Sequence, residues 1–337
     1  MHQFFRGKYR KIMDAAVIII GLFCLLSLFN VMLDPPYIIP VIAGVFVLYC
    51  IWFLPRAYRY LDRRVSPVHD NDTKKVKNEI NKNTMPISQT PVWDVLLFLS
   101  ITLITFMLLH FFILYMHEFS HSFTAYFLGA KADPLNIIWG KSIFGVNCDE
   151  NVNYQALFAA GKGPTAAAIA FAGPLSNILL FIITATLLSY KAVRANPWVY
   201  HTVFWASGIT FIMVFEYVFT RSFMTHDDFG NIKYGLGISP WFIFIPGLIF
   251  GFLGLWYILM VLVPNHYRIV TPGELPCQYV TIATLSFVFF LLYIGTRILA
   301  FPVVPEWWCG CAGIAALFIV PLLVSPKRLW VQRKIGE

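Results

Sequence analysis

The sequence predicts an all-α protein that crosses a membrane several times, and three observations carry the prediction. Of its 337 residues, 58% are hydrophobic and only 12% are charged, whereas a soluble domain carries about 25% charged residues. Apolar runs of about 20 residues, long enough to cross a hydrocarbon core of about 30 Å, recur along the chain. Segments inside a bilayer must satisfy their own backbone hydrogen bonds, and runs of this length do so as helices.

We expect about eight transmembrane helices. They lie near residues 13–33, 37–55, 93–128, 165–189, 198–224, 240–263, 277–301 and 307–325. The third is too long for a straight crossing, because at about 1.5 Å per residue it would extend roughly 50 Å. The chain then divides into an N-terminal pair of spans (1–55), a basic polar loop (56–92), a core that carries the polar motifs (93–235), and C-terminal spans with a basic tail (236–337).

The distribution of lysine and arginine predicts the orientation of the chain. These residues are concentrated in the N-terminal segment, the polar loop and the C-terminal tail. Basic flanks favour the cytoplasmic side, and an even number of spans puts all three there, so we expect both termini in the cytoplasm. The net charge is +8. The basic residues responsible lie beside hydrophobic runs, which indicates contact with anionic lipid headgroups and not with nucleic acid.

The third span carries a group of polar residues, because the apolar stretch LLHFFILYMHEFSHSFTAYFLG contains HEFSH. On a helix, His117 and His121 are one turn apart on the same face, so their ring nitrogens can converge on one tetrahedral zinc ion. Glu118 is rotated by about 100° and can act as general base on the attacking water without being a ligand. An ionisable group within a span costs about 2.5–3.5 kcal/mol, so three together favour a functional site over chance.

Two later segments offer further polar groups. A catalytic zinc site needs a third protein ligand and an open position, and the best candidates follow the fifth span in FMTHDDFGNI, which contains His226, Asp227 and Asp228. Taken alone, the two aspartates are also typical of a solvated turn. The fourth span contains AFAGPLSNILLF, where Gly173-Pro174 breaks or kinks the helix and Asn177 adds an amide in apolar surroundings. An ordinary proline kink is the alternative.

HEFSH in a membrane helix, GPLSN in a later span and an Asp-x-Gly turn after it resemble the site-2 protease family of intramembrane zinc metalloproteases. The resemblance runs from about Leu97 to Gly235. It implies that His117 and His121 bind zinc and that Glu118 activates water. It also implies that Asn177 helps to hold the substrate or the oxyanion.

The third ligand is where the sequence departs from that family. The family's usual form is Leu-Asp-Gly preceded by an Asn-x-x-Pro stretch, whereas this chain has His-Asp-Asp-Phe-Gly-Asn-Ile. Setting DFGNI against the family's D-G-G-x-I/V pattern favours Asp228 as the third ligand, with Asp227 as the alternative. The charge-based topology also starts the third span in the cytoplasm, whereas the corresponding helix of the family usually runs the other way.

Between the third and fourth spans, β-prone patches at Asn136–Trp139 and Ser142–Val146 flank Gly140-Lys141, a pattern that fits either a hairpin or an ordinary loop. In the family this position holds a membrane-associated β segment whose edge takes substrate as an added strand. We therefore expect a zinc metalloprotease that hydrolyses peptide bonds of membrane-anchored proteins within or beside the bilayer. The alternative is a non-catalytic transporter or scaffold that binds metal or protons at the same residues.

Overall fold

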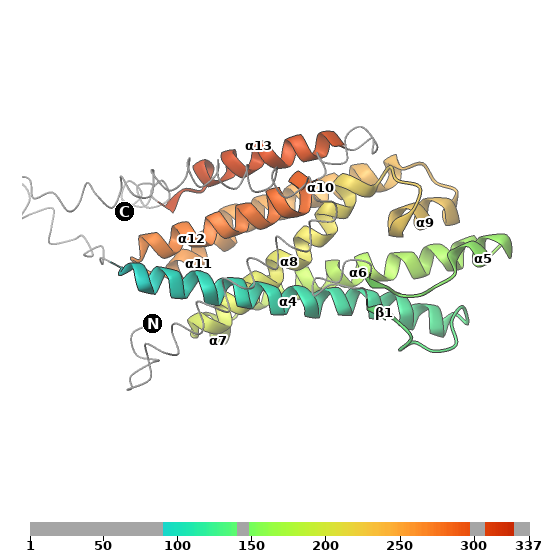
Figure 1. Cartoon of the computed structure of the whole chain (residues 1–337), viewed down its shortest axis with the longest axis horizontal. Helices are drawn as coiled ribbons and strands as arrows, with labels where there is room; N and C mark the ends of the chain where they lie inside the picture. The colour runs from blue at the N-terminus through green and yellow to red at the C-terminus, as the bar shows by residue number, and fades with distance from the viewer. Residues whose placement is uncertain (1–89, 140–147, 297–306, 327–337) are drawn as a thin grey trace, which may run out of the picture.

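The computed structural model describes residues 90–139, 148–296 and 307–326 (Figure 1). The predicted N-terminal pair of spans, nearly all of the basic loop and the basic tail lie outside these residues. So do the predicted Gly140-Lys141 turn and the predicted strand at Ser142–Val146.

Helices make up most of the described chain. In order, the elements are α4 (Val92–Phe127), β1 (Ile138–Trp139), β2 (Cys148–Asp149), α5 (Tyr154–Ala159), α6 (Gly163–Leu187), α7 (Lys191–Arg194), α8 (Pro197–Arg221), α9 (Asp227–Leu236), α10 (Trp241–Tyr257), η1 (Ile258–Leu262), α11 (Val263–Ile269), α12 (Leu275–Ser286), η2 (Phe287–Ile294) and α13 (Trp307–Leu323). The segments η1 and η2 are π-helical and continue the α-helices before them.

Among the described residues, five helices are long and apolar enough to cross a membrane: Val92–Phe127, Gly163–Leu187, Pro197–Arg221, Trp241–Ile269 and Leu275–Ile294. A sixth apolar helix, α13, is shorter. Each overlaps a predicted span; Trp241–Ile269 extends past the predicted end at residue 263, and residues 297–301 of the predicted span 277–301 lie outside the described residues. The described part of the chain is therefore consistent with an all-α membrane protein, as its composition predicts.

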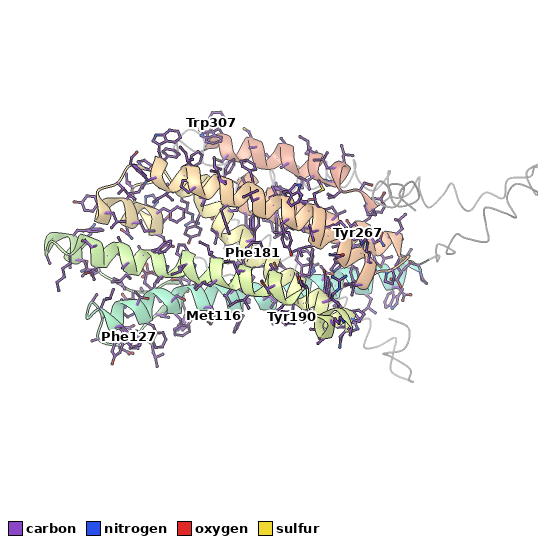
Figure 2. The ribbon with its side chains drawn as sticks, turned by 180° about the vertical axis from the view of Figure 1, so that it is seen from behind. Met116, Phe127, Phe181, Tyr190, Tyr267 and Trp307 are labelled. Atoms are coloured by element: carbon purple, nitrogen blue, oxygen red, sulfur yellow. The ribbon has the colours of Figure 1, made fainter. Side chains whose placement is uncertain are left out.

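The core forms around α8, which packs against α4, α6 and α10. Large side chains such as Trp205, Phe211 and Phe289 are fully buried there, and Phe181 lies in the middle of the bundle (Figure 2). Glycines on α10 allow close approach, since a Cβ at Gly254 would overlap the ring of Phe211. Because lipid tails are as apolar as the side chains, close packing of this kind is a main source of association between membrane helices.

Helix α6 positions the polar motifs, because it contacts α4, α8 and α9. Helix α6 packs closely against α9 where two glycines meet. A Cβ at Gly163 would lie 2.5 Å from the carbonyl oxygen of Gly235. Figure 1 shows α9, α5 and β1 gathered at the same end of the bundle, beside the C-terminal part of α4. Helix α6 thus lies against both of the helices that hold HEFSH and HDDFG.

A short antiparallel ladder lies beside α4. Trp139 of β1 pairs with Cys148 of β2, and the Trp139 ring packs edge-on against Tyr115 and Phe119 of α4. Strand β1 falls within the β-prone patch predicted at Asn136–Trp139, whereas β2 begins after the second predicted patch. The amine of Lys131 links this segment to α4, because it donates to the Ser122 hydroxyl and to the carbonyls of Asn136 and Glu150.

Candidate metal centre

The two histidines of HEFSH face each other on α4. Their Nε2 atoms are 3.1 Å apart, as expected for imidazoles separated by one helical turn. Both side chains are almost fully enclosed by the neighbouring helices, with His117 2% and His121 1% exposed. Two ring nitrogens are therefore held close together in a site that excludes bulk water.

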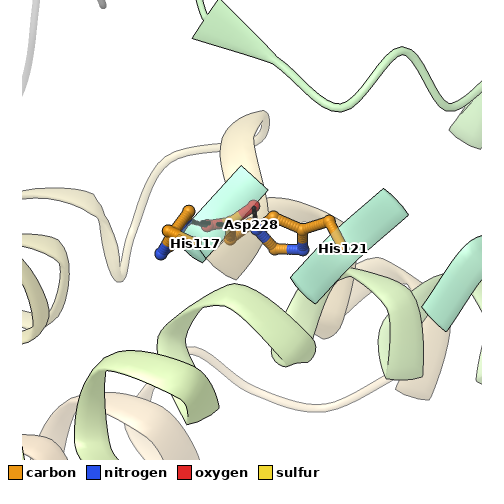
Figure 3. A group of neighbouring side chains, drawn as sticks. All are labelled: His117, His121 and Asp228. Atoms are coloured by element: carbon orange, nitrogen blue, oxygen red, sulfur yellow. Dashed lines mark hydrogen bonds and ion pairs between the residues drawn. The ribbon is translucent and has the colours of Figure 1, made fainter. Parts of the chain in front are cut away.

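Asp228 brings a carboxylate to the same point from the first turn of α9 (Figure 3). Its Oδ2 atom is 3.2 Å from Nε2 of His117, and its Oδ1 atom is 3.4 Å from Nε2 of His121. All three potential ligand atoms lie within 4.8 Å of one another, and this is the only such group of three or more ligating side chains among the described residues. Two imidazoles and one carboxylate from segments over a hundred residues apart in sequence thus converge.

The neighbouring candidates are directed elsewhere. Asp227 has a left-handed backbone with φ of 63°, and its carboxylate lies 3.2 Å from the guanidinium of Arg221. The His226 side chain is 71% exposed. Arg221 is itself held by Glu216 at 3.3 Å and lies over the ring of Tyr217. The structure therefore brings Asp228 to the histidines and places Asp227 in an ion pair that anchors the start of α9, which was predicted only as a turn.

Two opposing effects set the charge of Asp228. Burial would raise its pKa, but the imidazole of His121 and hydrogen bonds from both histidines lower it, and the net pKa lies well below the usual value. Asp228 is therefore an ionised carboxylate facing two ring nitrogens. A divalent cation such as zinc binds an ionised carboxylate together with two imidazole nitrogens.

One face of α6 lines the histidine pair. Ile169, Gly173 and Asn177 recur every four residues and so lie on the same side of the helix. The Ile169 carbonyl accepts from Nδ1 of His121 at 2.7 Å, and the Asn177 amide lies 3.0 Å from Nδ1 of His117. Since the later histidine meets the earlier residue of α6, the two helices run antiparallel along this contact.

The GPLSN motif explains this close approach. A Cβ on Gly173 would lie 2.6 Å from Nε2 of His117 and closer still to Nε2 of His121, so only glycine leaves the space that both Nε2 atoms face. Pro174 has no amide hydrogen, so the helical donor to the carbonyl four residues earlier is missing, but α6 continues through Pro174 without the break that the sequence suggested. The adjacent Ile169 carbonyl accepts from His121.

The hydrogen bond to Ile169 fixes the tautomer of His121. A carbonyl oxygen can only accept, so Nδ1 of His121 carries the proton. In the neutral ring the lone pair is then on Nε2, the atom that faces His117 and Asp228. This neutral tautomer, with its lone pair on Nε2, is the form of His121 that binds a metal.

Two acidic residues border the site. Glu118 follows His117 on α4 and is buried at 7% exposure. Glu150, which the sequence did not single out, follows β2 and is equally buried. Burial raises the pKa of Glu150, while His121 and the hydroxyl of Tyr154 act in the opposite direction. No motif marks Glu150, because the β1–β2 pairing and Lys131 bring it here.

Comparison with protein-family models, with curated proteins and with solved structures gives no match. The donors nevertheless fit zinc, since catalytic zinc sites use three protein ligands of this kind and keep one position open. Gly173 leaves room for an ion beside the ligands, because a Cβ at this position would lie within 2.6 Å of Nε2 of both histidines.

Proposed function

We propose that the protein is an intramembrane zinc metalloprotease that hydrolyses peptide bonds of membrane-anchored proteins within or beside the bilayer. One observation carries the proposal: His117, His121 and Asp228 converge, and the two histidines and Glu118 belong to a helix long and apolar enough to cross a membrane. The order of the HEFSH, GPLSN and Asp-x-Gly motifs, which resembles that of the site-2 proteases, supports the same function.

His117, His121 and Asp228 would hold the zinc ion. When bound, zinc acts as a Lewis acid that polarises the scissile carbonyl and lowers the pKa of water. Asp228 neutralises part of the positive charge, and the Ile169 carbonyl keeps His121 in its binding orientation. The ion pair between Asp227 and Arg221 holds the first turn of α9, and with it the position of Asp228.

Glu118 would act as the general base and general acid of the reaction. It lies one residue from His117, rotated by about 100° around the helix, so it stays beside the ligand pair without joining it. As general base it takes a proton from the attacking water, and as general acid it gives that proton to the leaving amine. Its burial keeps competing solvent away from the transfer.

The substrate would be a membrane-anchored protein with a locally unwound segment, because the amides of an intact helix are sterically closed. The ladder of β1 and β2 suits such a segment, since an extended peptide gains backbone hydrogen bonds by pairing with a strand. The Trp139 contacts with Tyr115 and Phe119 hold this ladder beside the helix that carries the histidines. The lysine and arginine bias supports an orientation with both termini in the cytoplasm.

The test compares wild-type protein with Glu118→Gln in liposomes that contain a membrane-anchored reporter substrate. The variant keeps the shape of the side chain but removes the base, so cleavage should fall by about 10²–10⁴-fold while bound zinc is retained. Asp94→Asn is the matched control, because it makes the same change in the first turn of the same helix, and it should cleave normally.

A wild-type protein that holds zinc but cleaves no membrane-anchored reporter would contradict the proposal. So would equal cleavage by wild type and Glu118→Gln. Either outcome would favour the non-catalytic alternative, a transporter or scaffold that binds metal or protons at the same residues.

A further inference from the structure

Asn177 forms a contact that its predicted role with substrate does not explain. The nitrogen end of its amide lies 3.0 Å from Nδ1 of His117, and the two side chains are 1% and 2% exposed. The amide oxygen is buried and has no hydrogen-bond partner among the described residues. Since a buried acceptor without a partner destabilises the folded state, the orientation of this amide requires an explanation.

The two ends of the amide correspond to two tautomers of His117. If the NH₂ group donates to Nδ1, the proton of the neutral ring is on Nε2, which can donate to Asp228 at 3.2 Å. In that state Nε2 has no lone pair for a metal. If the amide is turned by 180°, its oxygen accepts from a protonated Nδ1, and Nε2 is free to bind.

Oxygen and nitrogen of an amide are assigned from their hydrogen bonds, and both orientations fit the same side-chain position. The contact with His117 can therefore reverse without any movement of α6. His121 differs in this respect, because its Nδ1 faces the carbonyl of Ile169, which accepts in every state. Of the two histidines, only His117 has a partner that can both donate and accept.

We propose that Asn177 is a positioning residue for His117, whose amide oxygen accepts the Nδ1 proton when zinc is bound and whose NH₂ group donates to Nδ1 when it is not. This inference rests on the zinc site of the proposed function. In the zinc-bound state the NH₂ group becomes the end of the amide without a partner, so it is a buried donor. A buried donor of this kind agrees with the predicted contact of Asn177 with a substrate carbonyl or oxyanion.

Two substitutions separate the accepting role from donation and from packing. Asn177→Leu keeps the size but removes both groups, and zinc affinity should fall by about 10–100-fold, as for other groups that orient metal-bound histidines. Asn177→Asp keeps only an acceptor, so it should bind zinc at least as tightly as wild type. Gln278→Leu is the control, because it removes a buried amide that donates to Thr271 at 2.8 Å away from the histidines; its zinc affinity should not change.

Zinc affinity is measured on the full chain in detergent by competition with a chelator of known affinity. In parallel, ¹⁵N spectra of histidine-labelled protein report which nitrogen of His117 is protonated. We expect Nε2 to be protonated without zinc and Nδ1 with zinc, and the Nδ1 proton should exchange slowly with solvent in wild type but rapidly in Asn177→Leu.

Each contrary result has a distinct meaning. Equal zinc affinity in wild type and Asn177→Leu would show that Asn177 only packs, and the positioning role would be wrong. An affinity of Asn177→Asp as weak as that of Asn177→Leu would show that an accepting group at this position does not support zinc binding, and the accepting role would be wrong. A wild-type protein that binds no zinc would overturn the metal site itself, together with this inference.

Discussion

Gly173→Ala tests whether the space beside the histidines is the metal position. The added Cβ would lie 2.6 Å from Nε2 and 2.7 Å from Cε1 of His117, and closer still to Nε2 of His121. Real Cβ atoms do not approach other atoms this closely, so the rings must move. The contacted atoms are the metal-facing ones, and any movement that relieves the overlap also separates the ligands.

The magnitude follows from the strain of an overpacked site. Added methyl groups in well-packed interiors cost about 1–3 kcal/mol, and about 1.4 kcal/mol corresponds to a tenfold change in a binding constant. If the strain is relieved only when zinc is absent, zinc affinity should fall by about 5- to 140-fold. The protein should remain folded, because the ring movements that exclude zinc also remove the overlap.

Chelator competition on purified protein measures this change. Gly254→Ala is the matched control, because its Cβ would lie 2.8 Å from Cδ2 of Phe211, a comparable overlap between two other helices. We expect Gly254→Ala to lower the melting temperature and to leave zinc affinity unchanged. Unchanged zinc affinity in Gly173→Ala, with a melting temperature lowered as in the control, would refute the placement of the metal between the two Nε2 atoms.

Two further predictions concern the acidic residues. Asp228→Asn should weaken zinc binding by more than the roughly 10–100-fold typical of supporting groups, whereas Asp227→Asn should keep its zinc, because Asp227 pairs with Arg221; the reverse pattern in metal analysis would make Asp227 the ligand. Because burial raises the pKa of Glu150, the folded zinc-free protein holds this proton to higher pH than the unfolded chain. The stability that the proton confers is complete at low pH and decreases as pH rises. As pH rises above the range in which a glutamate of the unfolded chain titrates, the melting temperature of zinc-free wild type should therefore decrease relative to that of Glu150→Gln, and parallel pH profiles would contradict the shift.

Hydropathy was sufficient to place the apolar helices. Each of the five membrane-length helices coincides with a predicted span, because a segment that must satisfy its backbone in lipid has few alternatives to a helix. The π-helical segments η1 and η2 were not predicted. They change the hydrogen-bonding register within an unbroken apolar run, and apolar composition does not specify that register.

The histidine pair was equally accessible from sequence, since a spacing of four residues on a helix determines which side chains meet. The choice between Asp227 and Asp228 was not, because adjacent residues differ only in the direction of their side chains. That direction depends on the left-handed backbone of Asp227 and on Arg221, which belongs to a different helix. The sequence shows Arg221 as a charged residue at the end of an apolar span, but it does not show that Asp227 is its partner.

The role of Asn177 also depends on packing between distant segments. Sequence placed it one turn after Gly173, but which atom of His117 it meets follows from the antiparallel contact of α4 and α6. The prediction that Asn177 holds substrate or the oxyanion stays a prediction, and its contact with His117 adds a second role to be tested.

The most direct test of the metal centre is the zinc content of the purified chain. We predict one zinc per chain in wild type and almost none in the His117→Ala/His121→Ala variant. The matched control is His201→Ala/His266→Ala, which removes another buried histidine pair whose nitrogens lie 3.0 Å apart but which belongs to no ligand group with an acidic residue among the described residues. That variant should keep one zinc per chain. Stoichiometric zinc retained after loss of His117 and His121 would contradict the proposed centre.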